Sequence, residues 1–390
     1  MAGQELLYEG REQTLVKHYI LRHYLERFAH IVGSRWGSIT YVDGFAGPWN
    51  ARSSSFRDSS FAIALEELRK ARATLAQRGR RLGLRSLFLE ENPDACAQLK
   101  SFASKVRGVD ELQVLNRSFE EAVGSVVEFV RKGGPETFPF VFIDPTGWTG
   151  FALETIAPLL RLDPGEALIN FMTSHIRRFI RDAPSRQSFR ELFGSLGFMD
   201  RIADLTGLEL EEACVAEYSE GLRREGRYQY VLPAIVLHPE IDRTHFHLLY
   251  ATRHPKGVEV FKDAERKAMR EMEKARAEAQ QRTRVARSGQ AELAFVKGDS
   301  PESRYYNRLR ERYLGEAEKN TTALLRGQRS VLYEEVWEKA LSLPLVWESD
   351  LIGWIRDWQA KGLLRVEGLR GRELVPKRHQ NHQLIWDQAG

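Results

Sequence analysis

The feature that most restricts the fold of this chain is an alternation of short apolar runs with amphipathic segments. The runs are SITYVD (38–43), SLFLE (86–90), ELQVLN (111–116), FPFVFIDP (138–145) and EALINFM (166–172), and segments with helical spacing separate them. The 138–145 run is nearly all apolar, which is typical of a parallel strand buried on both faces. The alternation therefore predicts an α/β fold with helices on both faces of a parallel sheet.

Two more strands are expected at 228–237 and 244–251, with only residues 238–243 between them. A crossover helix does not fit in this gap, so these two strands should be antiparallel. Between the fifth and sixth strands, residues 175–226 have a mostly helical pattern. We expect them to form a helical insertion in a Rossmann-like domain.

The length of 390 residues suggests two or three domains. Residues 1–270 should form the large domain. Residues 271–310 then read as a charged helical linker, either a solvated bridging helix or one that faces a partner. Residues 311–390 should form a smaller α+β domain. Helical patterns at 331–343 and 347–364, followed by two short strands around Gly371 within 365–375, give it a winged-helix-like outline.

The net charge of the chain is only +4, from 58 basic and 54 acidic residues. Residues 361–378 hold six basic and two acidic residues, which is a local net charge of +4. Arginines on a wing can contact phosphates, so this segment predicts a nucleic-acid interface. The alternative is a protein-binding or dimerisation module of the same shape. The candidate contacts are Arg365, Arg370, Arg372, Lys377 and Arg378.

The motif YVDGFAGP (41–48) predicts a ligand-binding turn at the end of the first strand. Ligands of open parallel sheets lie beyond the carboxyl ends of the strands, and glycines allow a close backbone approach. The motif is not GxGxxG, and residues 49–60 separate it from the next helix. A ligand without phosphates at this point, such as S-adenosylmethionine, fits better than a diphosphate. The alternative is an ordinary turn. The candidate residues are Asp43, Gly44, Phe45, Ala46 and Gly47.

Two more strand ends carry acids. Glu90, after the second strand, is placed to accept the ribose hydroxyls of an adenosine moiety, unless it only belongs to a helix N-terminus. Asp144 begins DPTGW after the fourth strand. There it could accept hydrogen bonds from an amine that receives a methyl group, while Pro145 fixes the turn and Trp148 stacks on a base. The alternative is a turn with a core tryptophan.

Metal and thiol chemistry are not expected. His245 and His247 have a metal-like spacing, but no cysteine or acid pattern joins them, so sheet packing is the preferred interpretation. Cys96 and Cys214 are too few for a disulfide framework and fit a reducing cytoplasm. No apolar run reaches about 18 residues, so no membrane span is expected.

These motifs together resemble class I S-adenosylmethionine-dependent methyltransferases, and more narrowly the three-Cys-motif partner protein family (TcmP). The resemblance covers about residues 11–270 and includes HFHLLYATRHPKGVEVFKDAERKA at 245–268. It implies S-adenosylmethionine as cofactor, S-adenosylhomocysteine as product, and a three-Cys-motif protein encoded nearby as partner.

Two departures from the pattern concern the site. Where such enzymes place an aspartate on the adenine amine, this chain has Ser118, followed by Phe119. In the Asp-Pro-Pro-aromatic motif of base-amino methyltransferases, Thr146 and Gly147 replace the last two residues, and Trp148 comes one place later. Thr146 is kept as a candidate acceptor-site residue.

Three functions remain open. The first is a methyltransferase that acts on nucleic acid with a partner protein. The second is a cofactor-binding partner protein that has the fold without turnover. The third is a metal-dependent nuclease, because Asp43, Glu90 and Asp144 at neighbouring strand ends could imitate an acidic metal cluster.

Overall fold

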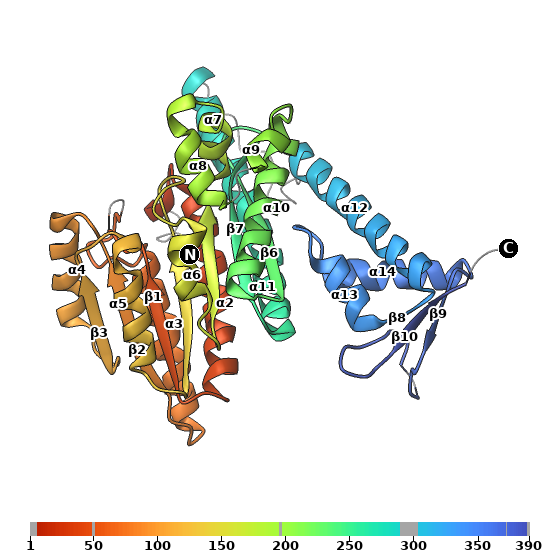
Figure 1. Ribbon diagram of the computed structural model, residues 1–390, viewed down its shortest axis with the longest axis horizontal. Coiled ribbons are helices and arrows are strands. Elements are labelled where there is room, and N and C mark those ends of the chain that lie inside the picture. The colour runs from red at the N-terminus through yellow and green to blue at the C-terminus, as the bar shows by residue number, and fades with distance from the viewer. Residues whose placement is uncertain (1–5, 49–50, 195–196, 289–302, 372, 388–390) are drawn as a thin grey trace. The chain divides into compact units, whose positions relative to one another are not determined.

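The computed structural model describes residues 6–48, 51–194, 197–288, 303–371 and 373–387 (Figure 1). The chain divides into two compact units, Met1–Gly298 and Asp299–Gly390. This division falls within residues 271–310, the segment expected to link the two domains.

The first unit is built on a sheet with the strand order β3-β2-β1-β4-β5-β7-β6. Its strands are β1 (Ser38–Asp43), β2 (Gly83–Leu89), β3 (Glu111–Leu115), β4 (Thr137–Ile143), β5 (Glu166–Phe171), β6 (Tyr230–Leu237) and β7 (Thr244–Thr252). β1 to β5 pair in parallel, whereas β7 pairs antiparallel with both β5 and β6. The chain is therefore an α/β protein with a mostly parallel sheet, and the antiparallel final pair is confirmed.

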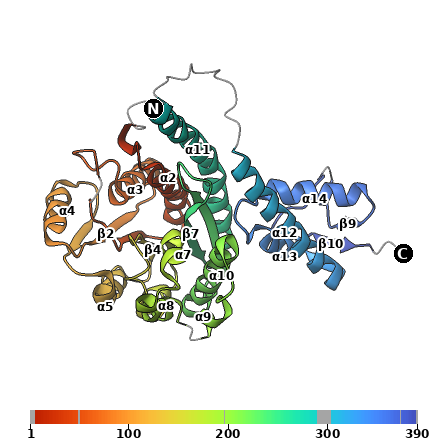
Figure 2. The same cartoon turned by 90° about the horizontal axis from the view of Figure 1, so that it is seen from above.

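Helices cover both faces of this sheet (Figure 2). α2 (Glu12–Gly33), α3 (Ser60–Gln77) and α11 (Pro255–Ser288) pack together on one face. α5 (Phe119–Arg131), α6 (Leu153–Leu160) and α10 (Gly207–Gly226) pack on the other, and α4 (Pro93–Lys105) lies at the β3 edge. Strand β5 is buried along its whole length. Such burial explains why the strand sequences are continuous apolar runs and not alternating ones.

The expected helical insertion begins directly after β5. It consists of α7 (Thr173–Phe179), the 3₁₀ turn η2 (Ala183–Ser185), α8 (Arg186–Phe193), α9 (Phe198–Arg201) and α10. Its apolar side chains join the core between the sheet and α5 and α6. The insertion is therefore packed as part of the first unit.

α11 does not become a solvated linker at residue 271. Met272, Ala275 and Ala279 are buried along its second half. Arg276 is buried as well, donates hydrogen bonds to the carbonyls of His238 and Ile241, and pairs with Asp242 at 2.8 Å. The thin apolar stripe is enough to hold the helix against α2 and β6. Of the expected linker, residues 289–302 lie outside the described residues.

The second unit is a small α+β structure. It consists of α12 (Arg304–Gln328), β8 (Ser330–Leu332), α13 (Tyr333–Leu341), α14 (Glu348–Ala360), β9 (Leu364–Glu367) and β10 (Gln383–Trp386). The sheet order is β8-β10-β9, with antiparallel pairing. Trp337, Tyr333, Leu351, Ile355 and Leu384 form its buried interior.

Two strands were expected within 365–375, and the prediction of the second one is wrong. β9 matches the first strand, but its partner is β10, which begins at Gln383. Leu374, expected in the second strand, is 78% exposed. Leu384 and Trp386 are buried instead, because they pack against the helices of the unit. A long connection, not a tight turn at Gly371, therefore joins the two strands.

Candidate functional site

Three acids meet at one edge of the parallel sheet. Asp43 is the last residue of β1, and Glu90 and Asp144 directly follow β2 and β4. Since β1 lies between β2 and β4, all three strands end at the same edge. The charge of Asp144 is close enough to Asp43 to contribute to raising its pKa. The structure thus brings the three predicted acids together.

Asp43 is completely buried and organises its own turn. Its Oδ2 accepts hydrogen bonds from Ser60 Oγ at 2.6 Å and from the Tyr41 hydroxyl at 3.2 Å. Its Oδ1 accepts the backbone N–H of Phe45 at 3.2 Å. Burial raises the pKa of Asp43 to about 7, although these hydrogen bonds oppose the shift. Asp43 therefore acts by holding the loop in place.

The turn after Asp43 is tied to both neighbouring strands. The N–H of Gly44 donates to Phe142 O at 2.9 Å in β4, and the N–H of Ala46 donates to Leu89 O at 2.8 Å in β2. A Cβ on Gly44 would lie 2.8 Å from the Phe119 ring, which also packs 5.5 Å from the Phe45 ring. Glycine is thus required at position 44 by Phe119, which was not the reason expected from the motif.

Glu90 is 5% exposed, and its Oε1 accepts the backbone N–H of Asn92 at 2.7 Å. Asn116, the first residue after β3, donates from Nδ2 to the carbonyls of Glu90 and Glu91, both at 2.9 Å. Sequence reasoning missed Asn116, although a polar residue directly after a strand was the available signal. Asn116 connects the ends of β2 and β3 beside the candidate cofactor turn.

Ser118, a candidate cofactor contact, has a capping role within the protein. Its hydroxyl is the N-cap of α5 and accepts the N–H of Glu121 at 3.4 Å. Phe119 is buried against Gly44. These two residues therefore have structural roles, and Asn116 takes the exposed position at the end of β3.

Both carboxylate oxygens of Asp144 have partners. Lys17 Nζ on α2 lies 2.5 Å from Oδ2, and Asn170 Nδ2 at the end of β5 donates to Oδ1 at 2.7 Å. Asn170 Oδ1 is buried and has no hydrogen-bond partner among the described residues. Neither Lys17 nor Asn170 was identified from the sequence, because their positions depend on pairings across 127 and 26 residues.

The loop after Asp144 joins the helical insertion. Pro145 is buried and Thr146 is exposed. The Trp148 ring packs against Phe189 at 5.1 Å and Phe179 at 4.9 Å, and its indole N–H donates to Ser188 Oγ at 2.9 Å. Trp148 is thus engaged as an anchor for α7 and α8. This matches the alternative of a core tryptophan rather than a ring that waits for a base.

The two histidines of β7 lie beside this acceptor region. Burial lowers the pKa of His247 to about 3 and is the main reason that the pKa of His245 falls to about 4. His247 Nδ1 lies 3.2 Å from Thr173 Oγ1. Within the described residues, no group of three or more His, Cys, Asp or Glu side chains could hold a metal ion. Cys96 and Cys214 are buried and do not form a disulfide.

The C-terminal basic residues are mostly committed to contacts within their unit. Arg365 pairs with Asp387 at 2.8 Å, and Lys377 with Glu373 at 2.9 Å. Arg378, whose side chain is 5% exposed, packs 4.3 Å from the Trp337 ring. The side chain of Arg378 is thereby removed from the surface where a phosphate would bind. The backbone N–H of Arg370 donates to Glu373, and Arg372 lies outside the described residues.

Comparison with known proteins does not identify a family for this chain. No family model matches the chain, and no curated protein matches it. One similar solved structure is protein LPL1258 from Legionella pneumophila str. Philadelphia 1, with the family model DUF519. It shares 13% identity over 61% of this chain and 85% of that chain. Its TM-score of 0.34 is too low to support an argument. No helix in the described parts of the chain is long and apolar enough to cross a membrane.

Proposed function

We propose that this protein is an S-adenosylmethionine-dependent methyltransferase that acts on nucleic acid together with a partner protein. The observation that carries the proposal is the joint position of the Asp43–Ala46 turn and Glu90 on adjacent strand ends. In open α/β sheets, this edge is where ligands bind. Parallel strands followed by an antiparallel final pair are also what the resemblance to class I methyltransferases, including the TcmP family, implies.

The residues at this edge fit the proposed cofactor. Glu90 offers a carboxylate for ribose hydroxyls at the mouth of the turn, and Asn116 fixes the backbone beside it. The turn itself is held by Asp43, so its backbone is organised before a ligand arrives. S-adenosylmethionine, when bound, supplies the methyl group. The chain's part is to hold donor and acceptor in line, which can account for most of the rate enhancement.

On the acceptor side, Asn170 takes the role first given to Asp144. The carboxylate of Asp144 orients the Asn170 amide through the 2.7 Å hydrogen bond, and Asn170 Oδ1 is then an acceptor without a partner in the described structure. A buried acceptor of this kind favours a substrate group that donates a hydrogen bond, such as an exocyclic amine. Lys17 holds the other oxygen of Asp144.

The second unit supports a nucleic-acid or protein partner. The order helix, strand, helix, helix, strand, strand is that of a winged helix, which we propose for this unit. The connection after β9 contains Arg370, Lys377 and Arg378 of the expected basic residues, and Arg365 lies in β9 itself. Most of those residues are already paired and offer less charge to phosphates. The same surface could therefore bind a protein partner, such as a three-Cys-motif protein.

A second candidate function is a cofactor-binding adaptor without turnover. The Lys17–Asp144 ion pair and the packed Trp148 ring favour it, since both occupy groups that an acceptor base would contact. A nuclease is not proposed, because Asp43, Glu90 and Asp144 do not form a metal-binding group in the described structure.

A methyl-transfer assay separates these two candidates. The protein is incubated with methyl-labelled S-adenosylmethionine and, in turn, with single-stranded DNA, RNA and a protein acceptor. We expect label in a nucleic acid, and a loss of about a hundredfold or more in Asp144→Ala and Asn170→Ala. Asp182→Ala, an exposed acid outside the site, is the control. Cofactor binding without transfer to any acceptor would support the adaptor instead.

A further inference from the structure

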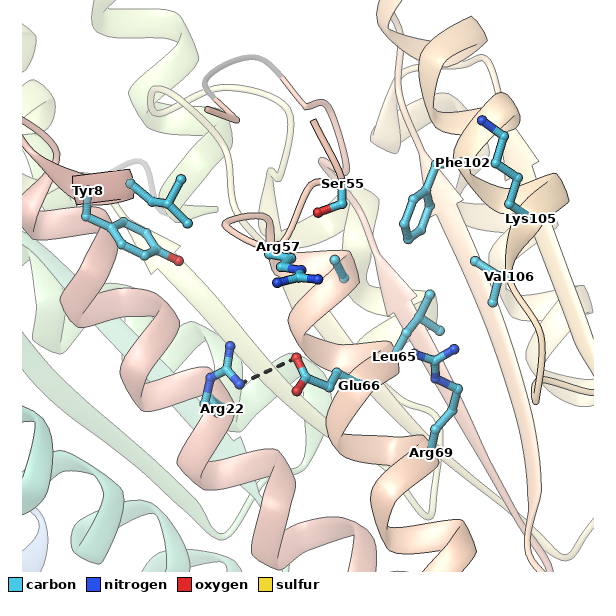
Figure 3. Close-up of a pocket in the computed structure, with 12 residues that line it drawn as sticks. Tyr8, Arg22, Ser55, Arg57, Leu65, Glu66, Arg69, Phe102, Lys105 and Val106 are labelled. Carbon is cyan, nitrogen blue, oxygen red and sulfur yellow. Dashed lines mark ion pairs between the residues drawn. The ribbon is translucent and has the colours of Figure 1, made fainter. Parts of the chain in front are cut away.

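A groove in the first unit, separate from the three strand-end acids, has a volume of about 860 Å³ (Figure 3). Its floor is one face of α3, on which the lining residues recur at spacings of three and four. These floor residues are Ala62, Leu65, Glu66 and Arg69. Tyr8 and Arg22 line one side, and Phe102 and Lys105 of α4, with Val106 directly after it, line the other.

The lining of this groove is strongly positive. Four of its residues are basic and Glu66 is the one acid. Glu66 is itself neutralised by Lys70 at 2.6 Å and Arg22 at 3.6 Å. Arg69 donates to the backbone carbonyl of Arg107, a neutral partner. Arg57 and Lys105 are exposed and form no ion pair with any described residue. Arg22 pairs with Glu67 at 3.1 Å. The cationic charge available to a ligand therefore comes from Arg57, Arg69 and Lys105.

Arg57 is presented by a fixed turn. Asp58, directly after it, accepts the N–H groups of Arg52 at 2.8 Å and Ser53 at 3.1 Å, and pairs with Arg11 at 2.6 Å. The many hydrogen bonds to Asp58 lower the pKa of its carboxyl against the opposing effect of burial. Because the turn is already ordered, binding at Arg57 does not have to order it.

An aromatic and apolar wall faces these cations. Phe102 is partly exposed, and its ring lies near Leu65 and Val106 in the lining of the groove (Figure 3). Phe61 and Phe56 both support Phe102 in edge-on contacts, with ring centroids 5.0 Å and 5.8 Å from that of Phe102. A positive groove with an aromatic wall is the combination that binds single-stranded nucleic acid, since phosphates pair with the cations and bases stack on the ring.

We infer that this groove binds a short segment of single-stranded nucleic acid. Duplex DNA keeps its bases inside the helix and could not use the Phe102 wall. An acidic peptide would match the charge but not the flat apolar face. This inference rests on the proposed function, because it names the class of nucleic acid that would be the substrate. It assigns substrate binding to the groove of the first unit and not to the C-terminal basic residues.

The test is fluorescence anisotropy with a labelled single-stranded oligothymidylate of about 20 nucleotides, long enough for one binding site. The full-length protein is used without cofactor. We expect Arg57→Glu/Arg69→Glu to weaken binding about tenfold or more. The slope of log K against log salt should fall by about 1.4, or about 0.7 for each lost phosphate contact. Phe102→Leu should weaken binding about fivefold or more.

The matched control is Arg81→Glu/Arg131→Glu, which changes the charge equally at exposed arginines outside the groove. Equal weakening in both double variants would overturn the inference, as would displacement of the oligonucleotide by polyglutamate at matched charge. Calorimetry with S-adenosylmethionine on the same groove variants should show unchanged affinity. If the wild type bound no S-adenosylmethionine but the groove variants still lost oligonucleotide binding, the methyltransferase proposal would be contradicted. The inference about the groove would stand.

Discussion

At the scale of single residues, the candidate cofactor turn is held in place by contacts within the protein. Asp43 accepts a backbone hydrogen bond from the turn, and Phe119 occupies the space that any side chain at position 44 would need. The positions of Asp43 and Glu90 were predictable, because each ends an apolar run in the sequence. The partners of Asp144 were not, since Lys17 and Asn170 reach it only after the sheet and α2 have assembled.

The buried Asp43 gives a pH prediction. Its pKa is about 7 in the folded protein against 3.8 for an unperturbed aspartate, so the folded state keeps a proton that the unfolded chain has lost. This group's contribution is therefore most favourable below about pH 4 and is lost as the pH rises to about 7. Asp43→Asn cannot ionise. The free energy of unfolding of this variant minus that of the wild type should therefore increase by up to about 4 kcal/mol when the pH is raised from 4 to 8.

Urea unfolding at the two pH values measures this difference. The control is Asp182→Asn, an exposed carboxyl whose replacement should leave the pH dependence as in wild type. A difference between Asp43→Asn and wild type that stays constant with pH would contradict the buried, protonated carboxyl.

At the scale of elements, the segment ATRHPKG connects several parts of the first unit. Arg253, just after β7, donates to the carbonyls of Leu160 at 2.7 Å and of Leu162 and Gly165 at 3.0 Å, and also to Gly226. Its guanidinium lies 4.4 Å from the Tyr228 ring. Thr252 donates to the buried Glu166 at 2.8 Å. This motif therefore ties together the ends of α6, α10, β5 and β7, and its role is structural.

Removing this clamp should destabilise the first unit. Arg253→Met leaves several carbonyl groups without a donor, so we expect the free energy of unfolding to fall by about 3 kcal/mol or more. Arg253→Lys should recover only part of the loss, because lysine cannot reproduce the planar fork. Thermal and urea unfolding, with the exposed Arg131→Met as control, test this. Equal stability of Arg253→Met and the control would show that the clamp contributes little.

The elements themselves were largely predictable. Each of the seven main strands is a local apolar run, and the short 238–243 connection indicated the antiparallel pair. β10 was missed because its partners, β8 and β9, are distant in sequence, and Gly371 offered a misleading local turn signal. The second half of α11 looked solvated because its charged residues outnumber the apolar ones, although Arg276 is among the buried residues.

At the scale of the whole molecule, the chain consists of two units with separate interiors. The second unit buries Trp337 and Tyr333 between its helices and its sheet. A fragment of residues 303–390 should therefore fold independently, with cooperative thermal unfolding by circular dichroism. Trp337→Ala should abolish this transition or lower the stability by about 3–5 kcal/mol. A wild-type fragment without a cooperative transition would contradict the independence of this unit.

The central claim, that the strand-end site binds S-adenosylmethionine, is tested most directly by isothermal titration calorimetry on the full-length protein. The account predicts 1:1 binding that is about tenfold to a hundredfold weaker in Glu90→Gln, which loses a charged hydrogen-bond acceptor. Binding should be unchanged in Glu91→Gln, the exposed neighbour. No binding to the wild type, or equal affinity in the two variants, would contradict the assignment of the site.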